Sequence, residues 1–180
     1  MQVRRSVGVL AATVAVVVSM VGCSKSASGS GDAVTFTDNV CGSFIPFLEA
    51  ASKPPNVSTS DPVKASAGVS QYLGNAVTAV EKAITGLDHA GKSPVAGGDE
   101  VVAKTKAALA QIKTAFSNAK ATLDSAPNTP TAKAAALNKA ASTMSSLSNL
   151  PDPTADLKAN AELNAAAEKA PNCQKMKTIK

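Results

Sequence analysis

Apolar side chains recur at helical spacing through most of the chain. From Pro62 to about Ala90 they step by three or four positions with one serine among them: Val63, Ala67, Ser70, Leu73, Val77, Val80, Ile84 and Leu87. The segment from Asp99 to about Ser125 repeats the pattern with Val102, Thr105, Leu109, Ile112, Phe116, Ala119 and Leu123. A one-sided stripe of this period is typical of an amphipathic α-helix. At about 1.5 Å per residue each helix is about 40 Å long, which suits near-antiparallel partners in a bundle.

Two shorter helices are predicted toward the C-terminus. One ends before Pro151 and has a stripe of Ala134, Leu137, Ala141, Met144 and Leu147. The other runs from Pro153 to about Ala170, with Leu157 and Leu163 among many alanines. Pro171 is expected to end this helix, because proline lacks the backbone donor that a helix interior needs.

The aromatic residues gather in the first helical segment, from Val34 to Ser52. It holds three of the four phenylalanines, and its apolar residues are Phe36, Val40, Phe44, Phe47 and Leu48. Pro46 removes one backbone donor and either bends this helix or starts a second short one. Residues 53–59 include two adjacent prolines and predict an extended loop. No run alternates apolar and polar residues with a sustained period of two, so no strand is predicted.

Helix starts are marked by a capping residue followed by proline, at Asp61-Pro62, Thr129-Pro130 and Asp152-Pro153. Aspartate or threonine accepts unpaired amide protons of the first turn, where the missing N–H of proline costs nothing. A fourth start is predicted at Gly98-Asp99-Glu100, because two acidic residues in a first turn complement the helix dipole. The sequence therefore predicts an all-α bundle of four to five helices.

The first 22 residues have the pattern of a secretion signal. Arg4 and Arg5 precede an apolar stretch from Val7 to Val21. That stretch has 15 residues, whereas a membrane-spanning helix needs about 20. A cleaved signal is therefore favoured over a permanent transmembrane helix. Arg4 and Arg5 are interpreted as the positively charged N-terminal region of an ordinary signal peptide in preference to a twin-arginine signal.

Met20-Val21-Gly22-Cys23, directly after the apolar stretch, resembles the lipobox of bacterial lipoproteins. The resemblance implies that Cys23 takes a diacylglyceryl group, that signal peptidase II cuts before it, and that the new amine can take a further acyl chain such as palmitate. The alternative is an ordinary signal peptide with a cysteine near its cut site. Two acyl chains hold a protein stably on a membrane, so the expected location is the extracytoplasmic face of the cell membrane.

The predicted organisation has three parts. Residues 1–22 form the signal peptide, and residues 23–33 contain the lipidated cysteine and a flexible tether. The tether is predicted because Ser24 to Asp32 is rich in glycine and serine. Residues 34–180 form the helical bundle domain.

Two further cysteines, Cys41 and Cys173, remain as an even pair near the two ends of the bundle domain. A disulfide is the simplest account in an oxidising compartment, and two free thiols are the alternative. Such a bridge requires Cα atoms within about 7 Å, so the first and last helical segments are predicted to be neighbours.

Charge disfavours nucleic acid as a partner. Without the signal peptide the chain keeps 16 lysines and no arginine against 13 acidic residues, a formal charge of +3. Arginine is the residue that reads phosphate and guanine bidentately. The scattered lysines instead indicate a solvated surface.

No catalytic, metal-binding or cofactor-binding set stands out. His89 is the only histidine and is predicted to be a surface residue at a helix C-terminus. A zinc site or a serine hydrolase triad needs partners that the chain lacks. Asp99 and Glu100 are adjacent, so on a helix they point to different faces and read as caps.

The whole chain resembles the small exported lipoproteins of mycobacteria and related actinobacteria. The resemblance rests on the lipobox, the alanine-, threonine- and valine-rich helices and the cysteine pair. The leading hypothesis is a non-enzymatic binding or interaction module of the cell envelope, whose partner is an envelope protein or a lipid. The alternatives are a carrier that holds an apolar ligand between helices and, less favoured, an envelope hydrolase.

Overall fold

The structure, a computed structural model, describes residues 25–53, 55, 57, 60–149, 152 and 154–179. The predicted signal peptide, the lipobox and Cys23 lie outside the described residues. Within them there is no strand, and the all-α prediction is confirmed. The elements are α1 (Lys25–Ala51), α2 (Pro62–His89), α3 (Gly98–Ser125), α4 (Pro130–Ser145), a 3₁₀ turn (Ser146–Asn149), α5 (Ala155–Ala159), α6 (Ala161–Ala167) and α7 (Pro171–Thr178).

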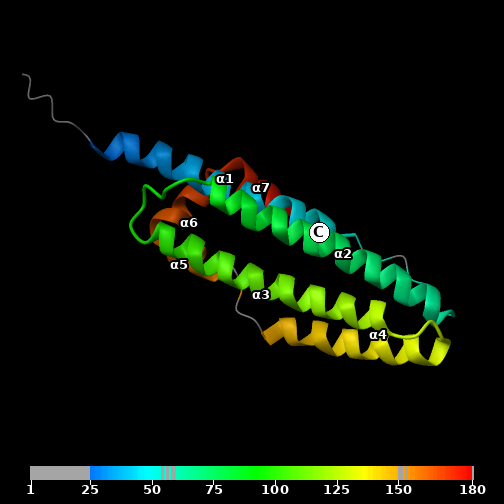
Figure 1. Cartoon of the computed structure of the whole chain (residues 1–180). Helices are drawn as coiled ribbons and strands as arrows, with labels where there is room; N and C mark the ends of the chain where they lie inside the picture. The colour runs from blue at the N-terminus through cyan, green and yellow to red at the C-terminus, as the bar shows by residue number, and fades with distance from the viewer. Residues whose placement is uncertain are drawn as a thin grey trace, which may run out of the picture.

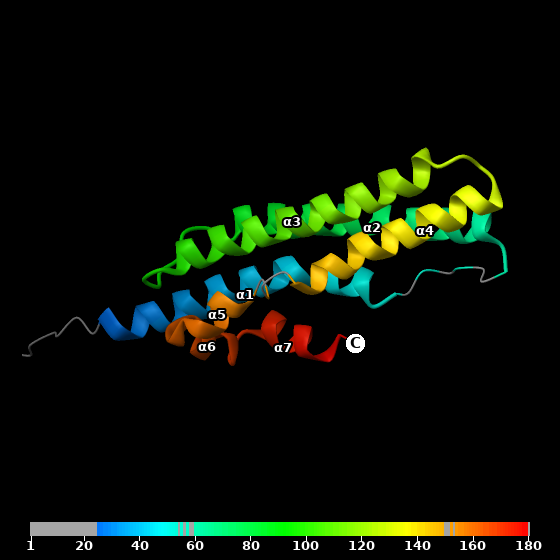
Figure 2. The same ribbon diagram turned by 90° about the horizontal axis from the view of Figure 1, so that it is seen from below.

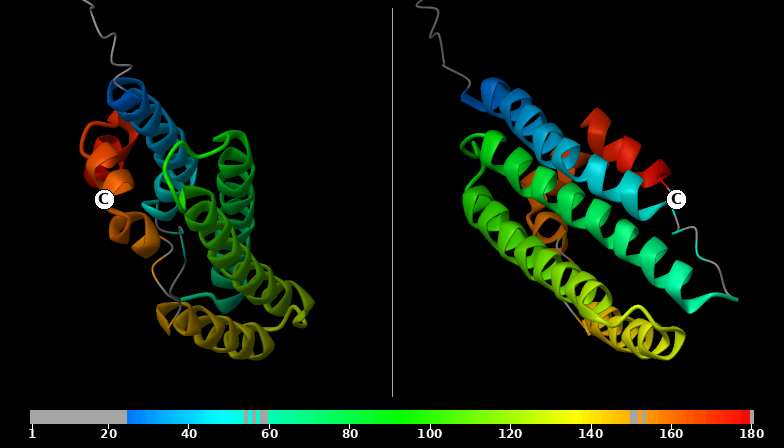
Figure 3. Two further views of the ribbon diagram at one scale, coloured as in Figure 1. Left: turned by 90° about the vertical axis from the view of Figure 1, so that its left-hand side faces the viewer. Right: turned by 45° about the vertical axis from the view of Figure 1, so that its right-hand side comes forward.

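Three long helices, α1, α2 and α3, lie side by side and alternate in direction (Figure 1). α4 returns along α3 and packs against both α2 and α3 at one end of the bundle. At the other end α6 and α7 pack against α1, and α5 packs against α3 (Figure 2). The fourth position of the bundle is thus filled by α4 over one half and by the C-terminal helices over the other (Figure 3).

Two of the three predicted cap-proline starts are confirmed. The Asp61 carboxylate accepts hydrogen bonds from the backbone amides of Val63 and Lys64, at 2.9 and 3.2 Å, and α2 begins at Pro62. The hydroxyl of Thr129 accepts from the amide of Ala132 at 3.3 Å, and α4 begins at Pro130.

The α3 start is also as predicted, with both acidic residues in the first turn. Gly97 takes the left-handed conformation (φ 75°) that turns the chain into the helix, which a side chain would strain.

The third cap-proline start is wrong, because α5 begins at Ala155 and not at Pro153. The Asp152 carboxylate instead accepts from the amide and hydroxyl of Thr154 and from the Lys158 ammonium, at 2.8, 2.7 and 2.8 Å. These bonds, that of Lys158 foremost, lower the pKa of Asp152 to about 2. The carboxylate forms a turn before the helix instead of capping it.

The predicted single helix from Pro153 to Ala170 is divided in two, which raises the number of described helices above the predicted four to five. The break is at Asn160, which is extended (φ −79°, ψ 111°). Its side-chain oxygen Oδ1 caps α6 by accepting from the amide of Leu163 (3.1 Å), and its side-chain NH₂ donates to the Ala96 carbonyl oxygen (3.1 Å). Because Ala96 precedes α3, this break depends on a tertiary contact. Pro171, expected to end a helix, instead occupies the first turn of α7.

The tether predicted over residues 24–32 differs as well, since α1 is helical from Lys25. The first buried residue of the chain's described part is Ala33. Glycine and serine are weak helix formers, but extending a helix already held by the core needs no new nucleus. Pro46 lies on an exposed face within α1, which continues through it as one helix.

The core follows the predicted stripe closely in α3, where Thr105, Leu109, Phe116, Ala119 and Leu123 are buried. α1 contributes buried Phe36, Val40 and Phe44, and the ring of Phe47 lies 6.5 Å from that of Phe116. In α2 four residues of the predicted stripe are buried (Ser70, Leu73, Val80 and Leu87), and Val77 and Ile84 pack partly buried against the core. Ala67 is exposed, and the buried face also includes Ser66, Ala76, Ala79 and Ala83. In α4 the buried residues are Ala136 and Ala140, not Ala134 and Ala141. Small side chains on these faces let two neighbouring helices pack closely against the same helix.

Thr37 is fully buried in α1, and its hydroxyl has no hydrogen-bond partner among the described residues. An unpaired buried hydroxyl costs about 1–3 kcal/mol. We expect Thr37→Val to raise the free energy of unfolding by about 1 kcal/mol, measured by urea denaturation. Thr35→Val is the matched control, because the Thr35 hydroxyl is exposed and already donates to Gly31. Destabilisation by Thr37→Val would contradict the prediction.

Candidate functional site

α1 and α2 approach closely where Ser43 lies opposite Gly86. A Cβ atom on Gly86 would lie 3.2 Å from the Cα of Ser43, tighter than ordinary packing. The absent side chain thus lets the two backbones come together. On the outer side of this contact the two helices leave a furrow, which we call the α1–α2 groove.

The α1–α2 groove consists of three hollows open to solvent. The middle one, about 400 Å³, is lined by Asn39, Gly42, Pro46, Lys82, Gly86 and His89. The second, about 350 Å³, lies toward the start of α1, shares Asn39 and includes Asp32, Thr35, Lys92 and Ser93. The third, about 360 Å³, lies toward the end of α1 and is lined by Ala50, Lys53, Gly68, Gln71, Tyr72 and Asn75.

The side chains of the groove come from one stripe on each helix. On α1 they recur at Asn39, Ser43, Pro46 and Ala50, and on α2 at Gly68, Asn75, Lys82, Gly86 and His89. Residues at this spacing share a helix face. The groove was not predicted from the sequence, although its polar and small residues recur at helical spacing.

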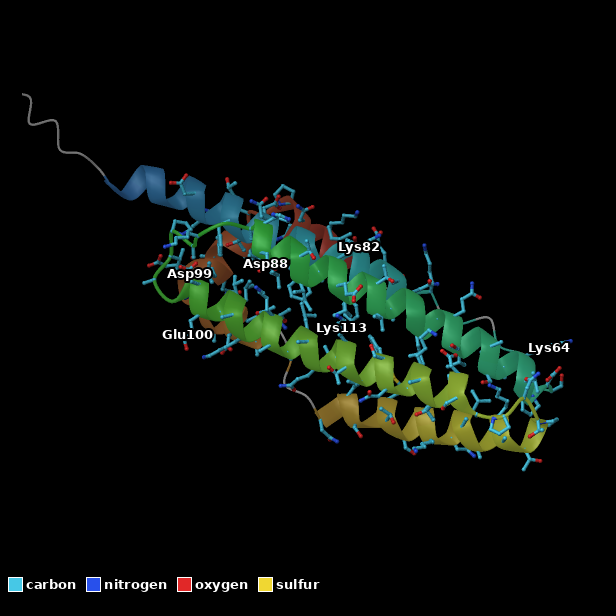
Figure 4. The ribbon with its side chains drawn as sticks, in the orientation of Figure 1. Lys64, Lys82, Asp88, Asp99, Glu100 and Lys113 are labelled. Atoms are coloured by element: carbon cyan, nitrogen blue, oxygen red, sulfur yellow. A yellow bond between two sulfur atoms is a disulfide. The ribbon has the colours of Figure 1, made fainter. Side chains whose placement is uncertain are left out.

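Lysines without a carboxylate partner gather in the groove. Lys53, Lys82 and Lys92 line it, and within the described residues none of them forms an ion pair. Ion pairs are instead made by Lys64, Lys104, Lys106, Lys113, Lys120, Lys158, Lys175 and Lys177. Figure 4 shows the contrast: Lys82 lies on the α1 side of α2, whereas Lys113 reaches between α2 and α3, where it pairs with Glu81 at 2.8 Å.

The carboxylates near the groove are largely engaged elsewhere. Asp38 accepts from the backbone amide and the side chain of Asn172 at 2.6 and 2.9 Å. Glu49 pairs with Lys175 at 3.2 Å. Asp32 lines one end of the groove without such a partner among the described residues. The charged side chains that line the three hollows are thus three lysines and one carboxylate, that of Asp32.

His89 is exposed at the last position of α2, as predicted for a surface residue at a helix C-terminus. It lines the middle hollow, whereas the adjacent Asp88 points to a different face of α2 and pairs with Lys106. In the described part of the chain, no three potential metal ligands lie close enough together to hold an ion. The groove thus presents amides, lysines and one imidazole to solvent.

One wall of the groove is fixed by the C-terminal helix. The sulfur atoms of Cys41 and Cys173 lie 2.00 Å apart and their Cα atoms 5.0 Å apart, as in the predicted disulfide. The predicted neighbour relation of the first and last helical segments is confirmed, since α7 packs along α1. Asp38 also caps α7 through the amide of Asn172, because Ala170 at its start has no capping side chain.

The fit of α7 on α1 requires a glycine. A Cβ on Gly42 would lie 2.9 Å from the side-chain nitrogen of Asn172, so this nitrogen occupies the space that a larger residue would fill. The Lys175–Glu49 pair adds a contact further along, although both side chains are about half exposed and contribute little energy.

No family model, curated protein or solved structure matches the chain. The assignment of a function therefore rests on the residues themselves.

A second polar cluster lies between α2 and α3, away from the groove. Asp124 accepts hydrogen bonds from the Lys120 ammonium and from the Ser70 hydroxyl, and these two bonds, that of Lys120 first, lower its pKa. Lys120 crosses α2 at Gly74, where a Cβ would meet its Cε at 3.3 Å. The Ser70–Asp124 hydrogen bond thus joins α2 to α3.

The prediction that Asp99 and Glu100 are caps is wrong, because the start of α3 has no side-chain cap hydrogen bond. Asp99 accepts from the amide of Ser93 at 2.8 Å, and Glu100 pairs with Lys104 at 3.1 Å. The two carboxylates thus contact different partners, as their adjacency on a helix implies. Among the described helices none is long and apolar enough to cross a membrane.

Proposed function

We propose that this chain is an exported lipoprotein, anchored through Cys23 to the extracytoplasmic face of the cell membrane, that acts as a non-enzymatic binding module. The observation that carries the proposal is the bonded pair of Cys41 and Cys173. Disulfides persist in oxidising compartments and are rare in the cytosol. This agrees with the secretion signal and the lipobox read from the first 23 residues.

The α1–α2 groove is the surface that we assign to binding. It runs along α1, the helix that begins two residues after Cys23, and it holds three lysines without carboxylate partners among the described residues. The rest of the surface offers little apolar area, since Val57 is the one large hydrophobic residue that is exposed in the described part of the chain. Recognition by polar and charged groups is therefore favoured over docking of an apolar face.

Lipidation provides the first test. Cells that express the full-length chain and are fed an alkyne fatty acid should label the wild type and Cys41→Ser, but not Cys23→Ser. The control variant retains Cys23 and loses a different thiol. Equal labelling of Cys23→Ser would contradict the anchor.

The binding role is tested by native mass spectrometry of the protein extracted from its own envelope. A partner that adds mass to the wild type, and that is lost when groove lysines are replaced, would support the proposal. A stoichiometric lipid beyond the covalent anchor would favour a carrier of apolar molecules instead.

A further inference from the structure

We propose that the α1–α2 groove binds an extended acidic peptide segment of a partner protein. The inference rests on the proposed function and names the chemistry of its partner. Charge, the unpaired amides and the length of the groove each lead to it.

Charge favours an anionic ligand. Lys53, Lys82 and Lys92 face the groove without an ion pair among the described residues, whereas most described lysines have one. A partner that brings carboxylates to these ammonium groups gains attraction without first breaking an existing pair. The charge of Glu49 is compensated by Lys175, whereas Asp38 accepts only from neutral amide groups of Asn172 and keeps its charge beside α7.

Polar side chains in the groove match a peptide backbone. Asn39, Gln71 and Asn75 are exposed, and their amide groups make no hydrogen bond to other described residues. Each carries a carbonyl acceptor and an NH₂ donor, the complement of a peptide C=O and N–H.

The length of the groove suits an extended chain. The α2 residues that line it run from Gly68 to His89, which are 21 positions apart, or about 32 Å at about 1.5 Å per residue. An extended peptide spans this distance in about ten residues, so an octapeptide covers most of it. A membrane surface fits less well, because the lysines line a concave furrow and no large apolar side chain beside it is exposed among the described residues.

The test measures fluorescence anisotropy with a labelled octapeptide of four Glu-Gly repeats, against the full-length chain extracted from membranes in detergent. We expect saturable binding that weakens as salt rises. The variant Lys82→Gln/Lys92→Gln should raise Kd about fivefold, from the loss of two exposed charge contacts.

Lys139→Gln/Lys169→Gln is the matched control. These two lysines are also exposed and without an ion pair among the described residues, but they lie outside the groove. The control should leave Kd unchanged, and circular dichroism should show the same helix content in both variants.

Three outcomes would overturn the proposal. The first is no saturable binding of the acidic octapeptide, and the second is an equal loss of affinity in the two double variants. The third, in a parallel measurement with phosphatidylglycerol vesicles as the probe, is binding to the vesicles but not to the peptide. None of these outcomes would change the interpretation of Cys23 labelling or of a partner detected by native mass spectrometry. Failure here is therefore distinguishable from failure of the proposed lipoprotein function.

Discussion

Removal of the bridge by Cys41→Ser/Cys173→Ser should lower the melting temperature by about 10 °C or more. The bridge closes a loop of 132 residues. In the chain-entropy model a loop of this size corresponds to about 5 kcal/mol, and a domain of this size loses about 2–4 °C per kcal/mol. Thermal unfolding followed by circular dichroism measures the change, with Cys23 unaltered in both proteins.

The double serine variant should be less stable than the wild type but still folded. α7 keeps the Asp38 cap and the Lys175–Glu49 pair on α1. We therefore expect native helix content at 20 °C in the double serine variant, with faster hydrogen exchange in α7. Addition of a reductant should shift the wild type by a similar amount and leave the variant unchanged. An unchanged melting temperature in the variant would argue that the two cysteines are free in the exported protein.

Leu163→Ala is expected to cost about 3 kcal/mol of unfolding free energy, because truncation of a fully buried leucine removes apolar contacts and leaves a cavity. Leu163 is the anchor of α6: it is 0% exposed and belongs to the main core with Phe36 and Leu87. Its methyl group also approaches Gly98 at the start of α3.

Leu157→Ala is the matched control in α5. Leu157 is only partly buried against the same core, so the same truncation should cost about 1 kcal/mol or less. Urea denaturation compares the two variants. Equal losses, or a larger loss for Leu157→Ala, would show that α6 is not integrated into the core as the structure places it.

The groove depends on positions that a sequence pattern does not reveal alone. Lysines on the surface of a helix read as solvated, and this holds for Lys104 or Lys113, which pair with nearby carboxylates. Lys82 has no acidic residue three or four positions away in α2, and α1 places Asn39 and Gly42 across the furrow from it. The first of these conditions can be read from the sequence, whereas the second depends on the packed helices.

Local signals in the sequence were sufficient to place most helices. Asp61 and Thr129 cap α2 and α4 at the residues predicted, because a cap uses amides only two or three positions away. The stripe of α3 was also read correctly, since its apolar residues fit one face. The cysteine pair was predicted from number and spacing, and its geometry then made α1 and α7 neighbours.

Tertiary contacts decided the rest. The break at Asn160 depends on the Ala96 carbonyl, and the cap of α7 depends on Asp38, which lies 134 positions away. The buried face of α2 is wider than the predicted stripe and includes Ser66, Ala76, Ala79 and Ala83, because α2 packs against α1, α3 and α4, and small side chains allow close approach on several sides. Sequence periodicity fixes which residues can share a face, but only the neighbouring helices select which face is buried.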